Sequence, residues 1–182
     1  MVHYGFEMSE QLGIPVLMRI TTRLAHSRAG VVRKPKRPQN EIHLPSDPRQ
    51  FILLPANARR QYKELLKKQP TFEAYAGNSG FNVFTDAEDK SMGVITTGIA
   101  YNYLLENYPD RLIPYPVLKI AQYPLPVAMV KLIYNSCDKL LILEEGSPLL
   151  EESIKGLLNT GKIIHGRLDG TVPRDGELNP NI

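Results

Sequence analysis

The sequence predicts an α/β fold of three layers, α/β/α, built on a mostly parallel sheet. Two observations carry this prediction. Short apolar runs alternate with helical patterns between residues 92 and 165, which is typical of a parallel sheet with helices on its faces. In addition, 42% of the 182 residues are hydrophobic, which suits a packed core and excludes a disordered chain.

The alternating part of the chain contains four expected strands and three expected helices. The strands are predicted at residues 92–96, 117–120, 140–143 and 162–165, and the helices at 98–107, 127–136 and 147–159. Ser147 is a good N-cap and Pro148 suits the first helical position. Glu151 and Glu152 favour the positive end of that third helix.

The first half of the chain is less regular. A helix is expected over residues 4–12, ended by Gly13, and is followed by a compact apolar run, Ile14–Ile20, that predicts a buried strand. Residues 57–68 predict a helix with an apolar stripe of Ala58, Tyr62, Leu65 and Leu66. The segments 29–50 and 70–91 show no periodicity, so an exposed linker is expected in the first and irregular structure in the second.

Charge and cysteine content exclude several classes of protein. The net charge is only +3, so the basic run Arg33–Pro38 is better explained as a solvated surface than as a nucleic-acid site. A single cysteine, Cys137, permits neither an internal disulfide nor an iron–sulfur cluster, and it is interpreted as structural. No apolar run approaches the roughly 20 residues of a membrane span. A cytoplasmic protein is therefore expected, and the abrupt start and end predict a segment of a longer chain.

The first candidate site is the segment Arg19–Arg28. Arginine forks match carboxylates in two-point geometry, so this segment has groups that could bind a 2-oxoacid. An equally weighted alternative is a hydrogen-bonded loop at a domain boundary. The candidate substrate contacts are Thr21, Thr22, Arg23, His26 and Arg28.

Two further segments are weaker candidates for an anion site or a domain interface. Asn57 is best explained as a helix N-cap, although Asn57 or Arg59 could face a ligand or a neighbouring domain. Thr97 and Gly98 lie between a strand and a helix, where backbone amides can bind anions, but a tight turn that needs Gly98 is favoured. The adjacent pair Glu144–Glu145 is assigned to salt bridging or helix-end electrostatics, because neighbouring side chains of an extended chain point apart.

Several segments together resemble the large subunits of indolepyruvate ferredoxin oxidoreductases, in the 2-oxoacid:ferredoxin oxidoreductase family. Each motif is short, but their common order makes the resemblance fairly specific and extends it over nearly the whole chain. The segments are Arg19–Arg28, Pro55–Arg59, Gly93–Asn102, Tyr123–Pro126, Leu141–Glu145 and Gly176–Pro180.

The resemblance implies a parent enzyme that oxidatively decarboxylates aryl pyruvates, with coenzyme A as acyl acceptor and ferredoxin as electron acceptor. The implied cofactors of the parent are thiamine diphosphate with Mg and [4Fe-4S] clusters, and a smaller beta subunit is an implied partner. The chain lacks the G-D-G motif of thiamine-diphosphate enzymes, so none of these cofactors is expected to be held by this segment, and no catalytic set is complete in it.

The resemblance also implies a division into domains. Residues 1–30 would be the tail of a pyrimidine-type domain, 31–56 a linker, and 57–182 a domain similar to the transketolase C-terminal domain, with a five-stranded sheet and one antiparallel strand. Alternatives left open are a relative that acts on pyruvate or a branched-chain 2-oxoacid, and a non-catalytic binding module. No nucleic-acid or membrane partner is expected.

Overall fold

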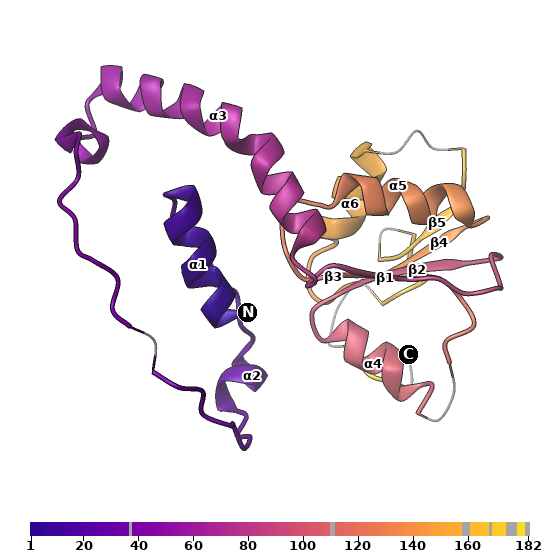
Figure 1. Ribbon diagram of the computed structural model, residues 1–182. Coiled ribbons are helices and arrows are strands. Elements are labelled where there is room, and N and C mark those ends of the chain that lie inside the picture. Colours follow the sequence, from indigo (N-terminus) through magenta and orange to yellow (C-terminus); the bar gives the residue numbers. More distant parts are fainter. Residues whose placement is uncertain (37, 110–111, 158–160, 168, 174–177, 181–182) are drawn as a thin grey trace. The chain divides into compact units, whose positions relative to one another are not determined.

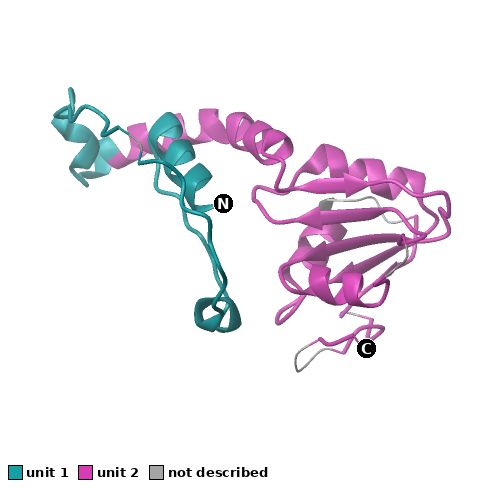
Figure 2. Cartoon of the chain, turned by 60° about the horizontal axis from the view of Figure 1, so that its bottom comes forward, with its two compact units in different colours: residues 1–57 teal, residues 58–182 magenta. Residues whose placement is uncertain are grey.

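The computed structural model describes residues 1–36, 38–109, 112–157, 161–167, 169–173 and 178–180. The chain divides into two compact units, unit 1 at residues 1–57 and unit 2 at residues 58–182 (Figure 2). The assignment of these parts to a pyrimidine-type domain, a linker and a transketolase-like domain remains a prediction.

Unit 1 consists of short helices joined by extended chain. Gly13 ends the first helix in the left-handed conformation, with φ of 62°, as the sequence predicted. The elements are α1 (Val2–Leu12), α2 (Thr22–His26) and the 3₁₀ helix η1 (Pro48–Phe51). The expected linker, residues 29–50, lacks regular structure up to η1 in its described part and is almost entirely exposed.

The predicted strand Ile14–Ile20 is wrong, because these residues form no strand and are half-buried or exposed. Leu17 is 98% exposed and Ile20 is 54% exposed. A strand needs a neighbour for its backbone groups. Among the described residues, every strand pairing lies within the sheet of unit 2, so this apolar run has no partner to pair with.

The long helix α3 (Pro55–Asn78) begins two residues before the predicted helix and continues ten residues beyond it. It passes through Pro70, which lacks a backbone donor and costs a helix about 3 kcal/mol. Ala76, near the end of the helix, is completely buried. The irregular structure predicted for 70–91 is therefore wrong for the end of α3 and for the short strand β1 (Val83–Thr85).

Unit 2 is built on a five-stranded sheet with the order β1-β3-β2-β4-β5 (Figure 1). Strand β1 pairs antiparallel with β3, and the other three pairings are parallel. The predicted fold class is thus confirmed, including the single antiparallel strand that the family resemblance implied. The remaining strands are β2 (Gly93–Thr97), β3 (Val117–Ile120), β4 (Leu140–Leu143) and β5 (Ile164–His165).

Three helices cover the two faces of this sheet, with α5 and α6 on one face and α4 on the other (Figure 1). The helices are α4 (Ala100–Glu106), α5 (Val127–Ser136) and α6 (Leu149–Leu157). Strands β3 and β4 and helix α5 have the predicted bounds. Helix α6 begins two residues after Ser147, and its predicted end at 158–159 lies outside the described residues.

Strand β4 serves both hydrophobic clusters of unit 2. Leu140 and Ile142 pack with α5 and α6, whereas Leu141 and Leu143 pack with α4 and Val172. Successive side chains of a strand point to opposite faces, so a run of four apolar residues is what a strand covered on both faces requires. Full burial of such side chains contributes about 1.5–3 kcal/mol each.

Cys137 lies in the larger of these clusters and is 1% exposed, which agrees with its interpretation as a structural residue. Among the described residues, no helix is both long enough and apolar enough to cross a membrane.

Close packing at the start of β2 leads to a first prediction. A Cβ atom at Gly93 would lie 2.8 Å from Ile133 Cγ1 and 2.9 Å from Cys137 Sγ. We expect Gly93→Ala to lower the free energy of unfolding by about 1–3 kcal/mol, because neighbouring side chains must shift. Urea denaturation followed by circular dichroism measures this change.

Gly156→Ala is the matched control for this substitution. Gly156 lies in α6, and a Cβ atom there meets nothing within 4 Å. We expect this variant to be more stable by about 0.5–1 kcal/mol, since alanine loses less conformational freedom in a helix. A Gly93→Ala variant as stable as the unaltered chain would contradict the packing described here.

Candidate functional site

The segment predicted to contact substrate forms the short helix α2 rather than an open loop. Thr21 is its N-cap, and the Thr21 hydroxyl accepts a hydrogen bond of 3.3 Å from the amide of Leu24. At the other end, the Ser27 hydroxyl donates to the Arg23 carbonyl over 2.7 Å. These local bonds explain part of the polar composition of Arg19–Arg28.

All side chains of residues 21–28 are exposed. Thr22 and His26 lie four residues apart and therefore share one face of the helix, with Arg23 beside them. The structure thus places the predicted contacts Thr21, Thr22, Arg23, His26 and Arg28 together on one surface segment of unit 1. Their role toward a substrate stays a prediction.

Asn57 is not the N-cap of α3, because the helix begins two residues earlier, at Pro55. Its side-chain amide donates to the Ile52 carbonyl over 3.3 Å and so ties the preceding segment to the first turn. Proline suits the first turn of a helix, and this outweighed the preference of asparagine for the cap position. Arg59 lies in the next turn and is exposed.

Thr97 and Gly98 lie at the carboxyl end of β2, where the chain turns toward α4. Gly98 has a φ of 60°, so the expected tight turn that requires glycine is present. Thr96 pairs with Leu143 in register, which places Thr97 beside Glu144 at the ends of neighbouring strands. Helices α4 and α6 leave these strands toward opposite faces, and in open α/β sheets ligands bind at such a point.

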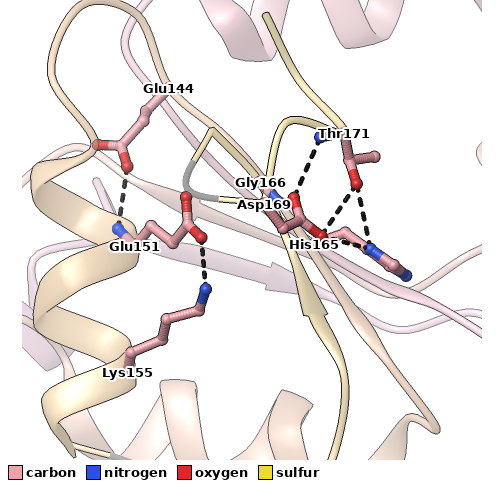
Figure 3. A network of polar contacts seen from close by, with 7 residues as sticks. All are labelled: Glu144, Glu151, Lys155, His165, Gly166, Asp169 and Thr171. Carbon is pink, nitrogen blue, oxygen red and sulfur yellow. Dashed lines mark hydrogen bonds and ion pairs between the residues drawn. The ribbon is translucent and has the colours of Figure 1, made fainter. Parts of the chain in front are cut away.

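Sequence analysis missed a polar network at the carboxyl ends of β4 and β5 (Figure 3). Glu144 is 3% exposed, and its two carboxylate oxygens accept hydrogen bonds from the amides of Leu150 and Glu151 at 2.8 and 2.9 Å. These amides belong to the first turn of α6, so Glu144 performs the capping that was predicted for Ser147. Burial raises the pKa of the Glu144 carboxyl, and the two amide donors oppose this shift.

Two more charged residues of this network are fully buried. Glu151 is 0% exposed and pairs with Lys155 at 2.7 Å. Arg167 is 1% exposed, and its Nε donates to the backbone carbonyl of Glu144 over 2.7 Å. A Cβ atom at Gly166 would lie 2.5 Å from Glu151 Oε2, so any larger residue there would require the Glu151 carboxylate to shift. The network joins β4, α6 and the segment after β5.

Beyond β5, Asp169 organises a tight loop. Its Oδ1 accepts hydrogen bonds from the amides of Gly166 and Thr171 at 3.0 and 3.1 Å, and its Oδ2 accepts from the Thr171 hydroxyl at 3.0 Å. His165 Nδ1 lies 2.8 Å from the same Oδ2. The hydrogen bond from the Gly166 amide, followed by the contacts with His165 and Thr171, holds the pKa of the Asp169 carboxyl below its usual range.

Because an ionised Asp169 carboxylate can only accept, a hydrogen bond between it and His165 requires the form of the ring in which Nδ1 carries a proton. A carboxylate four residues after a histidine at a strand end was the only sequence signal for this arrangement.

The buried charged groups Glu144, Glu151 and Arg167 all form hydrogen bonds or ion pairs with other groups of the chain. We therefore interpret this network as structural. Within the described ranges, no group of three or more His, Cys, Asp or Glu side chains is arranged to hold a metal ion. The single cysteine and the absence of G-D-G likewise do not fit an iron–sulfur cluster or the metal site of thiamine diphosphate.

The capping role of Glu144 gives a second prediction. Glu144→Ala leaves two buried amides of α6 without an acceptor, and we expect a loss of about 1–2 kcal/mol in the free energy of unfolding. Glu144→Gln keeps one oxygen acceptor and should lose less. Glu152→Ala, at an exposed position of the same turn, is the control and should change stability by no more than about 0.5 kcal/mol. Equal stability of Glu144→Ala and this control would refute the capping role.

The lowered pKa of Asp169 gives a third prediction. Because its folded pKa lies below the ordinary aspartate value of about 3.9, Asp169 stabilises the loop above that pH, and this contribution is lost as the pH falls through the folded pKa. Carboxyl ¹³C NMR should show Asp169 still ionised at pH 3 (roughly one unit below the ordinary value). Asp169→Asn should remove this signal and so assigns it; a midpoint near the ordinary value would be evidence against the hydrogen bonds described.

Comparison with known proteins finds relatives along the whole chain, whereas no protein-family profile matches it. The chain is 33% identical over 187 aligned residues to the indolepyruvate oxidoreductase subunit IorA of Methanothermobacter thermautotrophicus, covering 100% of this chain and 30% of that protein. It is 31% identical to the IorA subunit of Archaeoglobus fulgidus, over 96% of this chain and 28% of that protein. It is 32% identical to the IorA subunit of Pyrococcus abyssi, over 85% of this chain and 25% of that protein.

Among solved structures, part of this chain is similar to a 2-oxoglutarate:ferredoxin oxidoreductase from Magnetococcus marinus, determined with 2-oxoglutarate, coenzyme A and succinyl-CoA bound. The TM-score is 0.45 with 18% sequence identity, over 63% of this chain and 20% of that chain. The chain spans about 30% of the length of the first curated relatives. The chain is thus related, along its whole length, to one segment of the IorA subunit of indolepyruvate oxidoreductases.

Proposed function

We propose that this chain is a segment of the large subunit of an indolepyruvate-type 2-oxoacid:ferredoxin oxidoreductase. The parent enzyme would oxidatively decarboxylate aryl pyruvates to aryl-acetyl-CoA, with ferredoxin as electron acceptor and a smaller beta subunit as partner. The single observation that carries this proposal is continuous similarity to IorA subunits over 96–100% of the chain at 31–33% identity. A cytoplasmic location remains a prediction from the sequence.

Within the parent, unit 2 would serve as a scaffold. Its sheet is covered on both faces, and its buried carboxylates Glu144 and Glu151 are bound by helix amides and by Lys155. Because these carboxylates already have partners within the protein, we assign them to stabilising the fold and not to contacting a reactant. The thiamine diphosphate with Mg and the [4Fe-4S] clusters of the parent would be held by other segments.

Unit 1 would belong to a domain that other parts of the parent complete. Many of its large apolar side chains are exposed, and Leu17, Val31, Val32 and Leu44 exceed 80% exposure. A stable domain does not normally leave so many of its large apolar side chains this exposed to water. This surface supports the interpretation of residues 1–30 as the tail of a pyrimidine-type domain, with 31–56 as the connection to the transketolase-like domain.

The segment 21–28 supplies the possible contacts with substrate. Arg23 and Arg28 carry planar guanidinium groups that match a carboxylate, and His26 could polarise the adjacent keto group. Among the described residues of unit 2, Thr97 and Gly98 follow β2, whereas His165, Asp169 and Thr171 at the end of β5 use their polar groups to bond one another. We therefore assign any contact between this chain and an aryl pyruvate to α2 and its flanks.

A kinetic experiment on the parent enzyme tests both the activity and this assignment. Aryl-pyruvate-dependent reduction of ferredoxin in the presence of coenzyme A should be measurable for the complete enzyme. We expect Arg23→Ala or His26→Ala to lower kcat/KM about tenfold to a hundredfold, as for the loss of a hydrogen bond to a charged group. Arg33→Ala, in the exposed linker, is the matched control and should leave kcat/KM unchanged.

The outcomes separate the two parts of the proposal. Unchanged kinetics for both variants would give α2 a structural role while leaving the activity intact. A parent reading frame without G-D-G and without a cysteine-rich stretch, or a complete enzyme inactive on every aryl pyruvate, would overturn the oxidoreductase assignment.

A further inference from the structure

His165, Asp169 and Thr171 form a hydrogen-bonded group that takes no part in the capping of α6. His165 Nδ1 lies 2.8 Å from Asp169 Oδ2 and 3.1 Å from the Thr171 hydroxyl oxygen. The Thr171 hydroxyl donates to Asp169 Oδ2 over 3.0 Å, so its oxygen is available to accept from the ring. Both polar neighbours of the imidazole therefore bind the same ring nitrogen (Figure 3).

The backbone fixes the Asp169 carboxylate from its other side. Oδ1 accepts hydrogen bonds from the amides of Gly166 and Thr171 at 3.0 and 3.1 Å. The bond from Gly166 contributes most to lowering the pKa of this carboxyl, so Asp169 is ionised at neutral pH. An ionised carboxylate can only accept, and the proton that joins the two side chains therefore belongs to His165 Nδ1.

The second ring nitrogen of His165 remains available. A neutral imidazole carries one proton, so a proton on Nδ1 leaves a lone pair on Nε2. Among the described residues, the side-chain contacts of His165 all involve Nδ1, and 35% of the side chain is exposed. The structure thus holds an imidazole in one orientation and in one tautomer, with its basic nitrogen unused by the described chain.

The position of His165 in the sheet suits a ligand site. His165 is the last residue of β5, and in open α/β sheets ligands bind at the carboxyl ends of the strands. The preceding residue, Ile164, packs in the cluster of α5 and α6. Because successive side chains of a strand point to opposite faces, the His165 side chain lies on the face that α4 covers.

From this geometry, we propose that His165 is the proton acceptor for a small molecule that brings a hydroxyl or thiol group to Nε2. The O–H or S–H bond breaks, the proton binds Nε2, and the electron pair stays on the oxygen or sulfur of the ligand. Asp169 stabilises the imidazolium that forms, as the carboxylate of a catalytic triad does. The same negative charge disfavours a ligand whose reacting end is already anionic. The proposal rests on unit 2 and is independent of the proposed function.

The position of the proton is tested by ¹⁵N NMR of the imidazole nitrogens in the whole chain, at a pH where the rings are neutral. We expect the proton of His165 on Nδ1. In Asp169→Asn, the two backbone amides retain the side-chain oxygen, so the NH₂ group faces Nδ1 and should move the ring proton to Nε2. Asp138→Asn makes the same change at an exposed aspartate of unit 2 and should leave the His165 tautomer unchanged.

Diethyl pyrocarbonate tests the availability of Nε2, because this reagent attacks an unprotonated ring nitrogen. Exposure alone would rank His165 below His3 and His43, whose side chains are 57% and 77% exposed. We expect His165 to react faster than both at neutral pH, with each rate measured by mass spectrometry. Asp169→Asn should slow the modification of His165 at least about tenfold, whereas Asp138→Asn should not.

A thiol probe tests the proton transfer itself. In acetyl transfer from p-nitrophenyl acetate to 2-mercaptoethanol, the thiol loses its proton, the sulfur bonds to the carbonyl carbon, and p-nitrophenolate leaves with the electron pair of its bond. We expect the chain to accelerate this reaction, and His165→Gln or Asp169→Asn to reduce the acceleration at least about tenfold. His43→Gln is the matched control, and circular dichroism checks that each variant is folded.

Three results would overturn the proposal. One is a neutral His165 that carries its proton on Nε2. Another is a rate of modification of His165 that follows its exposure and does not respond to Asp169→Asn. The third is equal acetyl transfer by His165→Gln and the unaltered chain. Each would leave His165 as a structural partner that only helps to close the loop organised by Asp169.

Discussion

The second half of unit 2 depends on one carboxylate. Glu144 follows the last residue of β4 and binds two amides of α6, so the end of a central strand fixes the start of the helix that covers it. The backbone carbonyl of the same residue accepts from Arg167, which follows β5. One residue therefore joins three successive elements, and its buried charge is tolerated because helix amides solvate it in place of water.

Sequence patterns predicted the strands correctly where the folded chain buries the side chains of each apolar run. Strands such as Val117–Ile120 and Leu140–Leu143 are short apolar runs between helical patterns, and the sheet buries them as predicted. The run Ile14–Ile20 has the same composition but no strand beside it in the described chain, and composition cannot reveal the presence of a neighbour. Strand β1 escaped prediction because only Phe84 of its three residues is even half-buried.

The candidate sites were predictable to a lesser degree. Local spacing was enough to place Gly98 in a turn and to assign the pair Glu144–Glu145 to salt bridging or helix-end electrostatics, since both depend on neighbours in sequence. It was not enough to show that Glu144, rather than Ser147, caps α6, because this depends on how the chain folds back after β4. The loop ordered by Asp169 depends on hydrogen bonds that residue types alone do not specify.

The alternation of side chains along β4 also limits how this chain can change in length. Leu140 and Ile142 serve one cluster while Leu141 and Leu143 serve the other, so a single inserted residue would exchange the two sets and disrupt both sides of the sheet. The alignment with the Methanothermobacter thermautotrophicus relative extends over 187 positions against 182 residues here, and thus includes residues that this chain lacks. Insertions of this kind are compatible with the connecting segments, because a residue added there does not exchange the side chains that a strand directs to the two faces of the sheet. Divergence in length within this group of proteins should therefore concentrate outside the strands, while the strands themselves vary only by substitution.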